Sequence, residues 1–299
     1  MYRLLFLAPA ILLSLSTATR ANADSLTDNL GPRAVALGDS LRAESVGTQS
    51  TVLNPAGLAL NQQLVFEGSF GYRDSDKANI GSVAACDSTT PVAGCFYYHY
   101  LNSKPNLGEM DVTRRVHEAG VTAARALSKQ ILIGTNTRFF DLNSNANGEE
   151  DQRGYSIDMG LIFAPSTGVR IAGVGYNLIG TDSPQYPRGV GTGVVLRPGG
   201  GSLGLSLDAL WNLDRADGED TGRYGGGLEY LLAPTPIAAY PIRVGGVYDD
   251  LTDAGYASAG IGYSTPKMGI DIGGRKQLSG DGDEYIIQAG LRIVGPTPR

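Results

Sequence analysis

The chain has 299 residues, a formal charge of −6 and 42 glycines, and its share of glycine is about twice the usual value of roughly 7%. The acidic balance and the lack of any Lys/Arg cluster exclude nucleic acid as the main partner. Two histidines and two cysteines, without metal-ligand spacing or a catalytic triad pattern, argue against an enzyme, a metal site or a bound cofactor.

The first 23 residues have the pattern of an export signal. Arg3 supplies the positive charge, "LLFLAPAILLSLS" the apolar run, and Ala21-Asn22-Ala23 a small-x-small cleavage site. The run holds about 13 residues, short of the roughly 20 that a membrane-spanning helix needs. We therefore expect residues 1–23 to be removed on export.

Residues 24–61 form a segment that differs from the rest of the chain. Asn54 is a preferred helix N-cap and Pro55 is preferred at the first helical position, so "NPAGLALN" predicts the start of a short helix. Upstream, "RAVALGDSL" predicts another short turn of helix, which Gly38 ends.

The two cysteines, Cys86 and Cys95, lie close together in the sequence. An oxidising compartment outside the cytoplasm favours a disulfide between them, and two free thiols are the alternative. Closing so short a loop would contribute about 2 to 3 kcal/mol in the chain-entropy model.

Residues 62–299 alternate with period two, which is typical of β-strands. In "SLGLSLDALWNL" the odd-numbered residues from Leu203 to Leu213 are apolar, whereas Gly204, Ser206 and Asp208 fall on the opposite face. Fourteen such segments are expected, near 64–73, 78–86, 94–102, 114–127, 130–141, 153–164, 168–178, 189–197, 202–213, 223–232, 240–249, 254–264, 267–277 and 284–294.

These segments favour a membrane barrel over a soluble sandwich. They run about 9 to 13 residues, close to the length that crosses a bilayer at a tilt, and Tyr and Trp gather at their ends. Tight connections ("SK", "APST", "RPGG", "TP") alternate with longer ones, as in bacterial barrels with short periplasmic turns. We predict an all-β fold, a transmembrane antiparallel barrel of about 14 strands, in contact with the lipid of the bacterial outer membrane.

A barrel of this width has a lumen that side chains alone cannot fill. The helical segment 24–61 is therefore expected to fold back into the lumen as a hatch. On the lumen face the alternation places nine charged residues, and they are Glu118, Arg138, Asp158, Asp208, Glu229, Arg243, Asp271, Arg275 and Arg292. An ion-selective constriction is one interpretation, but signs that alternate between neighbouring strands favour charge pairs that hold the hatch.

The histidines receive no chemical role from the sequence. His99 lies in "CFYYHYL", where the surrounding aromatics predict a position in the lipid-facing aromatic belt. The glycine runs "PGGG" and "YGGGLEY" precede no helix, so they do not predict a phosphate-binding loop.

The N-terminal motif resembles the hatch of the FadL-type outer-membrane transporters and their shorter PorV-like relatives. The resemblance is carried by Gly31, Arg33, Ala34, Ala36, Leu37 and Gly38, followed by Asn54, Pro55, Ala56, Gly57, Leu58 and Ala59. The strands "GLEYLL", "PIRVGGVYDD", "GIGYSTPKMGIDIG" and "IIQAGLRI" look like the closing strands of the PorV-like branch.

This resemblance implies two alternative functions. In the first, the barrel passively transports small hydrophobic molecules past a hatch that contains Gly31, Arg33, Gly38 and Asn54-Pro55-Ala56-Gly57. In the second, a closed PorV-like barrel is a scaffold that binds the proteins of a surface secretion or motility machine through its loops.

Overall fold

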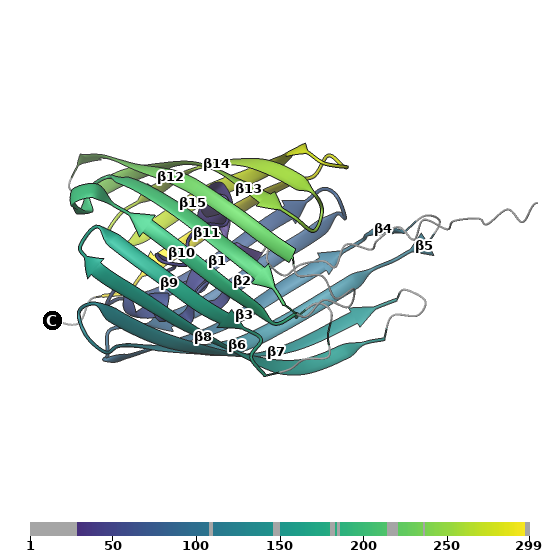
Figure 1. Ribbon diagram of the computed structural model, residues 1–299, viewed down its shortest axis with the longest axis horizontal. Coiled ribbons are helices and arrows are strands. Elements are labelled where there is room, and N and C mark those ends of the chain that lie inside the picture. Colours follow the sequence, from purple (N-terminus) through teal and green to yellow (C-terminus); the bar gives the residue numbers. More distant parts are fainter. Residues whose placement is uncertain are drawn as a thin grey trace, which may run out of the picture.

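A computed structural model describes residues 29–107, 110–145, 150–179, 183, 186–213, 221–235 and 237–296. The predicted export signal lies outside these residues. Fourteen antiparallel strands form a closed barrel, in which β1 (Leu64–Arg73) pairs with β16 (Tyr285–Val294) to complete the ring (Figure 1). The predicted fold class and the predicted number of strands are confirmed.

The other barrel strands follow in chain order. They are β2 (Ala78–Asp87), β3 (Val92–Ser103), β6 (Arg114–Ala126), β7 (Ile131–Ser144), β8 (Gln152–Ser166), β9 (Val169–Tyr176), β10 (Gly189–Leu196), β11 (Leu203–Asn212), β12 (Thr221–Thr235), β13 (Ala238–Asp249), β14 (Ala254–Ser264) and β15 (Met268–Ser279). The sequence did not predict the small hairpin of β4 (Asn106–Leu107) and β5 (Met110–Asp111), which projects from the barrel between β3 and β6 (Figure 1).

The two ends of the barrel differ in their connections. Residues 167–168 join β8 to β9 at the end where the C-terminus leaves the barrel, whereas residues 104–113 join β3 to β6 at the opposite end (Figure 1). We call these the C-terminal end and the loop end.

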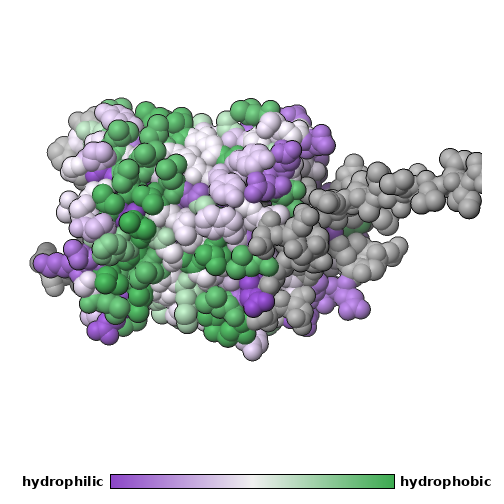
Figure 2. Space-filling model, in the orientation of Figure 1, coloured by the Kyte–Doolittle hydropathy of each residue, from purple (hydrophilic) through white to green (hydrophobic). Residues whose placement is uncertain are grey.

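The outer face of the barrel is apolar. Side chains such as Phe70, Phe96, Leu207 and Ile287 are more than half exposed, and apolar residues form broad bands across the surface in Figure 2. Their strand neighbours Ser206 and Gln288 point inward and are buried. Because successive side chains of a strand face opposite ways, the alternation in the sequence becomes an apolar exterior and a polar interior.

The hatch lies inside the barrel and consists of α1 (Pro32–Ala36), α2 (Thr48–Val52) and the 3₁₀ helix η2 (Pro55–Ala59). Helix α1 contacts β13 to β16, α2 contacts β2, β3 and β6, and η2 contacts β3 and β6 to β8. The sequence predicted α1 and η2 but not α2. In the described part of the chain, no helix is long and apolar enough to cross a membrane.

Lumen-facing glycines let the hatch backbone lie directly on the wall. A Cβ atom at Gly227 would lie 2.7 Å from the carbonyl oxygen of Leu37, and one at Gly245 would lie 2.6 Å from the amide nitrogen of Gly38. Gly134, Gly160, Gly225, Gly260 and Gly273 are in similarly close contact with hatch atoms. The high glycine content therefore has a structural reason, because any side chain at these positions would displace the hatch.

Candidate functional site in the plugged lumen

The predicted hatch motif divides into two contact regions. Gly31 and Gly38 have positive φ angles of 81° and 61°, and they border α1 on the β12–β16 side. Asn54 to Gly57 lie on the β6–β8 side, where the Oδ1 atom of Asn54 accepts a hydrogen bond from the amide of Ala56 at 3.0 Å. The structure therefore places the two halves of the motif on different sectors of the wall.

Asn54 also fastens η2 to its surroundings. Its Nδ2 atom donates to the carbonyl oxygen of Arg42 at 2.9 Å and to that of Leu161, in β8, at 3.3 Å. The side chain has no exposed surface. One amide group thus caps a helix, closes the hatch chain on itself and binds the wall.

Arg33 is the centre of the first charge network. Its Nε and Nη2 atoms each donate to a carboxylate oxygen of Glu229, both at 3.1 Å. Glu229 also accepts from Arg243 at 2.6 Å and from Arg197, and Arg243 pairs in turn with Asp271. Three predicted lumen charges, from β12, β13 and β15, thus form a chain of ion pairs that reaches one hatch arginine through Glu229.

Glu44 extends this network toward β9 and β10. Its carboxylate accepts from Arg170 at 2.7 Å, from Arg197 at 2.7 Å and from Arg33 at 3.3 Å. Burial would raise the pKa of Glu44, but the hydrogen bond from Arg197 and the surrounding positive charges outweigh burial and hold this pKa below its usual range. Glu44 therefore remains an anion that ties the hatch to the wall.

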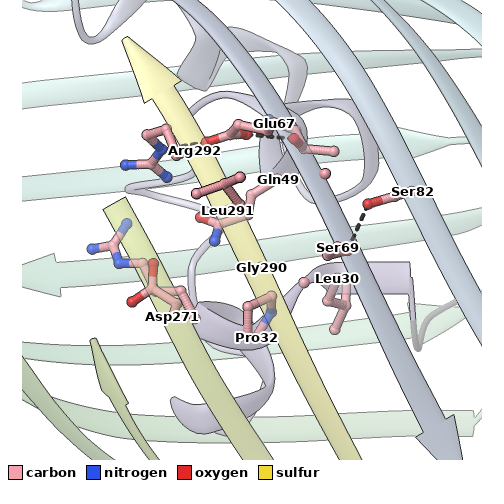
Figure 3. A pocket seen from close by; sticks show the side chains of 14 residues that line it. Leu30, Pro32, Gln49, Glu67, Ser69, Ser82, Asp271, Gly290, Leu291 and Arg292 are labelled. Carbon is pink, nitrogen blue, oxygen red and sulfur yellow. Dashed lines mark hydrogen bonds and ion pairs between the residues drawn. The ribbon is translucent and has the colours of Figure 1, made fainter. Parts of the chain in front are cut away.

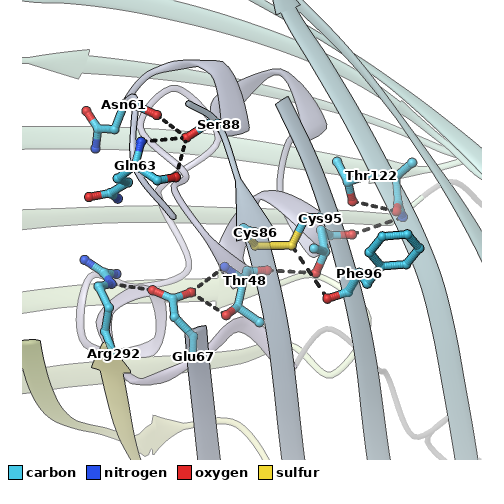
Figure 4. The surroundings of a disulfide bond; sticks show 12 residues. Thr48, Asn61, Gln63, Glu67, Cys86, Ser88, Cys95, Phe96, Thr122 and Arg292 are labelled. Atoms are coloured by element: carbon cyan, nitrogen blue, oxygen red, sulfur yellow. Dashed lines mark hydrogen bonds and ion pairs between the residues drawn. A yellow bond between two sulfur atoms is a disulfide. The ribbon is translucent and has the colours of Figure 1, made fainter. Parts of the chain in front are cut away.

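Two further predicted charges bind other parts of the hatch directly, and a third does so through a wall carboxylate. Asp208 pairs with Arg42 at 3.2 Å, and Arg275 pairs with Asp39 at 3.2 Å. Arg292 pairs with Glu67 of β1 (Figure 3), and Glu67 also accepts from Thr48 of the hatch (Figure 4). Arg292, Glu67 and Thr48 border a small pocket of about 40 Å³ between the hatch and β1, β2, β15 and β16, with Ser69, Ser82 and Gly290 on its wall side.

The remaining predicted charges, Glu118, Arg138 and Asp158, form a separate network on β6 to β8. Arg138 lies between the two carboxylates, 3.7 Å from Glu118 and in direct contact with Asp158. The Nδ1 atom of His99 lies 3.2 Å from Glu118, and the hydroxyl of Tyr186 donates to Glu118 at 3.3 Å.

The predicted position of His99 is wrong. Its side chain is 1% exposed and faces the lumen, whereas Phe96, Tyr98 and Tyr100 face outward or lie partly exposed. The error has a physical reason: Tyr97 and His99 occupy the inward face of β3, so aromatic side chains occur on both faces of this strand. Polarity cannot then tell one face from the other.

A cavity of about 120 Å³ lies between α2 and the loop end of the barrel. Leu30, Val52, Leu53 and Leu210 supply an apolar side. His99, Glu118 and Arg138, together with the rings of Tyr176 and Tyr186, supply the opposite side. Tyr186 is held in place by stacking on Phe140, with ring centroids 4.0 Å apart.

Cys86 and Cys95 lie directly opposite each other on β2 and β3 and are joined by a disulfide (Figure 4). Both are buried, and they pack in a cluster with Leu58 of η2. The disulfide thus supports the wall at a place where the hatch rests on it. The described residues contain no group of His, Cys, Asp and Glu suited to a metal ion.

The sequence prediction of lumen residues missed the charged hatch residues that pair with the wall charges, and it missed the tyrosines of the lumen. Asp39, Arg42 and Glu44 are charged residues in a segment with little polarity pattern, so no periodicity marked them as inward-facing. Tyr176 was detectable in principle, because it follows the inward positions Ala172 and Val174 in β9. Its hydroxyl accepts from Arg42 at 2.8 Å and donates to the carbonyl oxygen of Leu53.

No family model and no curated protein matches the chain. Solved structures with a similar fold include the toluene transporter TbuX of Ralstonia pickettii, with a TM-score of 0.65 and 12% identity over 91% of this chain and 98% of that one. The monoaromatic hydrocarbon channel CymD has a TM-score of 0.64 and 11% identity over 90% and 98%. A FadL homologue of Pseudomonas aeruginosa has a TM-score of 0.60 and 10% identity over 92% and 98%. The FadL-type fold expected from the hatch motif is therefore confirmed.

Proposed function

We propose that the protein is a bacterial outer-membrane channel for the passive transport of small hydrophobic molecules. The observation that carries this proposal is the cavity of about 120 Å³ that the hatch leaves between α2 and the loop end. A solute enters this cavity from the loop end, and displacement of the hatch opens the way onward. The fold, shared with hydrocarbon channels along almost their whole length, supports the same function.

The mode of attachment of the hatch also supports this function. The hatch is bound to the wall by hydrogen bonds and ion pairs, for example between Arg33 and Glu229 and between Arg42 and Asp208. The polar part of this attachment can be exchanged for contacts with water when the segment moves. An apolar cluster, in which Leu37 and Leu53 of the hatch pack with Ile80 and Leu101 of the wall, completes the attachment. No feature of the described residues favours the scaffold alternative.

A reversible crosslink tests whether the hatch must move. The Oγ atoms of Ser40, in the hatch, and Ser206, in β11, lie 2.7 Å apart, so the double substitution Ser40→Cys/Ser206→Cys places two sulfur atoms within bonding reach. Proteoliposomes with the oxidised variant should lose the uptake of toluene, and a reductant should restore it.

A second serine pair provides a matched control. The Oγ atoms of Ser69 and Ser82 also lie 2.7 Å apart, but both residues belong to the wall, in β1 and β2. A Ser69→Cys/Ser82→Cys crosslink should leave uptake unchanged, and the same reductant controls for opening of Cys86–Cys95. Uptake that is absent from the wild-type protein, or that persists with the hatch crosslinked, contradicts the proposal.

A further inference from the structure

The inward residues of β7 show what lies at each depth of the lumen, because this strand runs from the C-terminal end of the barrel to the loop end. Asn136 donates to the carbonyl oxygen of Thr51, in the hatch, at 3.1 Å. Arg138 comes next on the same face and lines the cavity of about 120 Å³. Phe140 follows and stacks on Tyr186. Along this strand the cavity therefore lies between the hatch and Tyr186.

Tyr186 reaches the lumen from the loop end. It belongs to the connection between β9 and β10, which begins after Tyr176 at that end of the barrel. Tyr186 is 3% exposed, and its ring lies 4.0 Å from that of Phe140 with an angle of 23° between the ring planes. Its hydroxyl donates to Glu118 at 3.3 Å. The side chain thus occupies the lumen on the loop-end side of the cavity.

The ends of this connection are fixed by contacts that do not involve the Tyr186 ring. Asn177 donates through its side chain to the carbonyl oxygen of Pro187 at 2.8 Å, which joins the two ends of the connection. The amide of Leu213 donates to the carbonyl oxygen of Arg188 at 2.8 Å. These contacts remain in place when the Tyr186 ring turns away from the wall.

The contacts of the Tyr186 ring can be broken without leaving a charge unpaired. Glu118, which accepts from the hydroxyl, also lies 3.2 Å from His99 and 3.7 Å from Arg138. A ring stack and a hydrogen bond that can be exchanged for water each contribute only modestly to stability. The ring can therefore leave its place and return while the barrel stays folded.

We infer that Tyr186 controls the entry of solutes from the loop end into the cavity. It acts as an outer gate, which opens when the ring turns away from Phe140 and Glu118. The hatch closes the cavity on the opposite side, so a solute meets two gates in turn. This inference deepens the proposed transport function and rests on it for the passage of a solute beyond the cavity.

A thiol placed in the cavity measures access through this gate. Val52, in α2, lines the cavity, and the two native cysteines are joined in a disulfide, so Val52→Cys supplies the only free thiol. The labelling rate with N-phenylmaleimide is measured on the full chain in nanodiscs. In this background Tyr186→Ala should raise the rate about tenfold, because it removes both the stack and the hydrogen bond. Tyr186→Phe keeps the stack and should raise the rate about threefold.

Two controls separate a gate from a general loosening of the protein. Tyr155→Ala removes a tyrosine that is 61% exposed on the outer face of β8, and it should leave the labelling of Val52→Cys unchanged. Val35, in α1, has no exposed surface, so a thiol in Val35→Cys reports on loosening of the hatch. Tyr186→Ala should not change the labelling of this second thiol. An unchanged rate at position 52, or an equal rise at positions 35 and 52, overturns the inference.

The outcome is separable from the fate of the proposed function, because labelling of the cavity requires no transport. Toluene uptake that depends on hatch movement, with labelling at position 52 unaffected by Tyr186→Ala, leaves the transport function standing and removes the gate. Faster labelling at position 52 alone, without toluene uptake by the wild-type protein, keeps Tyr186 as the gate of the cavity and removes the transport function.

Discussion

Arg33 of the hatch and Glu229 of β12 form a two-point ion pair across 196 residues of sequence, with both N–O distances at 3.1 Å. The two residues differ in the number of oppositely charged side chains that they contact. Glu229 accepts from three arginines, whereas Arg33 donates to two carboxylates, those of Glu229 and Glu44. This difference determines which of the two substitutions lowers the stability of the protein more.

Loss of the carboxylate should therefore destabilise the protein more than loss of the guanidinium. Glu229→Gln leaves Arg33, Arg197 and Arg243 close together without their shared anion, and we expect it to lower the free energy of unfolding by about 3 to 5 kcal/mol. Arg33→Met should have a smaller effect, because Glu229 keeps two partners.

Urea unfolding in detergent measures the free energy of unfolding of both variants. The exposed pair of Asp74 and Lys77 supplies the control substitution Asp74→Asn, for which no measurable loss of stability is expected. A larger loss for Arg33→Met would contradict the asymmetry.

The contact between wall glycines and the hatch predicts a steric effect at Gly227. Gly227→Ala places a methyl group 2.7 Å from the Leu37 carbonyl oxygen, so α1 must shift, at a cost of about 1 to 3 kcal/mol. Gly81→Ala is the matched control, since its Cβ would have no atom within 4 Å. Unfolding experiments and single-channel conductance in planar bilayers measure the change. Equal behaviour of the two variants would show that the hatch does not rest on Gly227.

On the lipid-facing side of β11, the loss of stability caused by an arginine substitution should depend on the depth of the residue in the membrane. Leu207 is 56% exposed and lies between Trp211 at one end of the strand and Leu203, opposite Tyr230, at the other. Leu207→Arg should destabilise the barrel by about 2 to 4 kcal/mol, whereas Leu203→Arg, near the interface, should cost about 0 to 1 kcal/mol. Folding into bilayers of defined thickness measures the difference. The depth assignment fails if Leu203→Arg proves the more damaging of the two.

The pKa of Glu44 predicts that acid loosens the hatch. Since this pKa is depressed in the folded protein, the stability that Glu44 contributes is present above its ordinary value of 4.5 and is lost as the pH falls through the lower, folded value. Pepsin, which is active in acid, should cleave the hatch increasingly as the pH falls below 4.5 toward the lower pKa of the folded protein. In Glu44→Gln cleavage should begin at a higher pH and change less with pH, and an unaltered profile would assign the effect to other carboxylates.

The sequence by itself determined the barrel. Period-two alternation is a local property of each strand, and the lipid requires an apolar side chain at every second position of a strand such as β11. The bounds of β1 and β14 match the predicted segments, and the local capping preference of Asn54 and Pro55 predicted η2. Each of these depends only on residues that are neighbours in the chain.

The tertiary structure decided which charges meet and what they enclose. Arg33 and Glu229, or Arg42 and Asp208, come together only after the barrel has closed around the hatch, so no local pattern encodes their pairing. His99 shows the same limit within one strand, because both faces of β3 carry aromatic side chains and only the closed ring defines which face is the interior. The cavity exists for the same reason: its lining comes from the hatch and from strands distant in sequence, and its shape is set by packing between them.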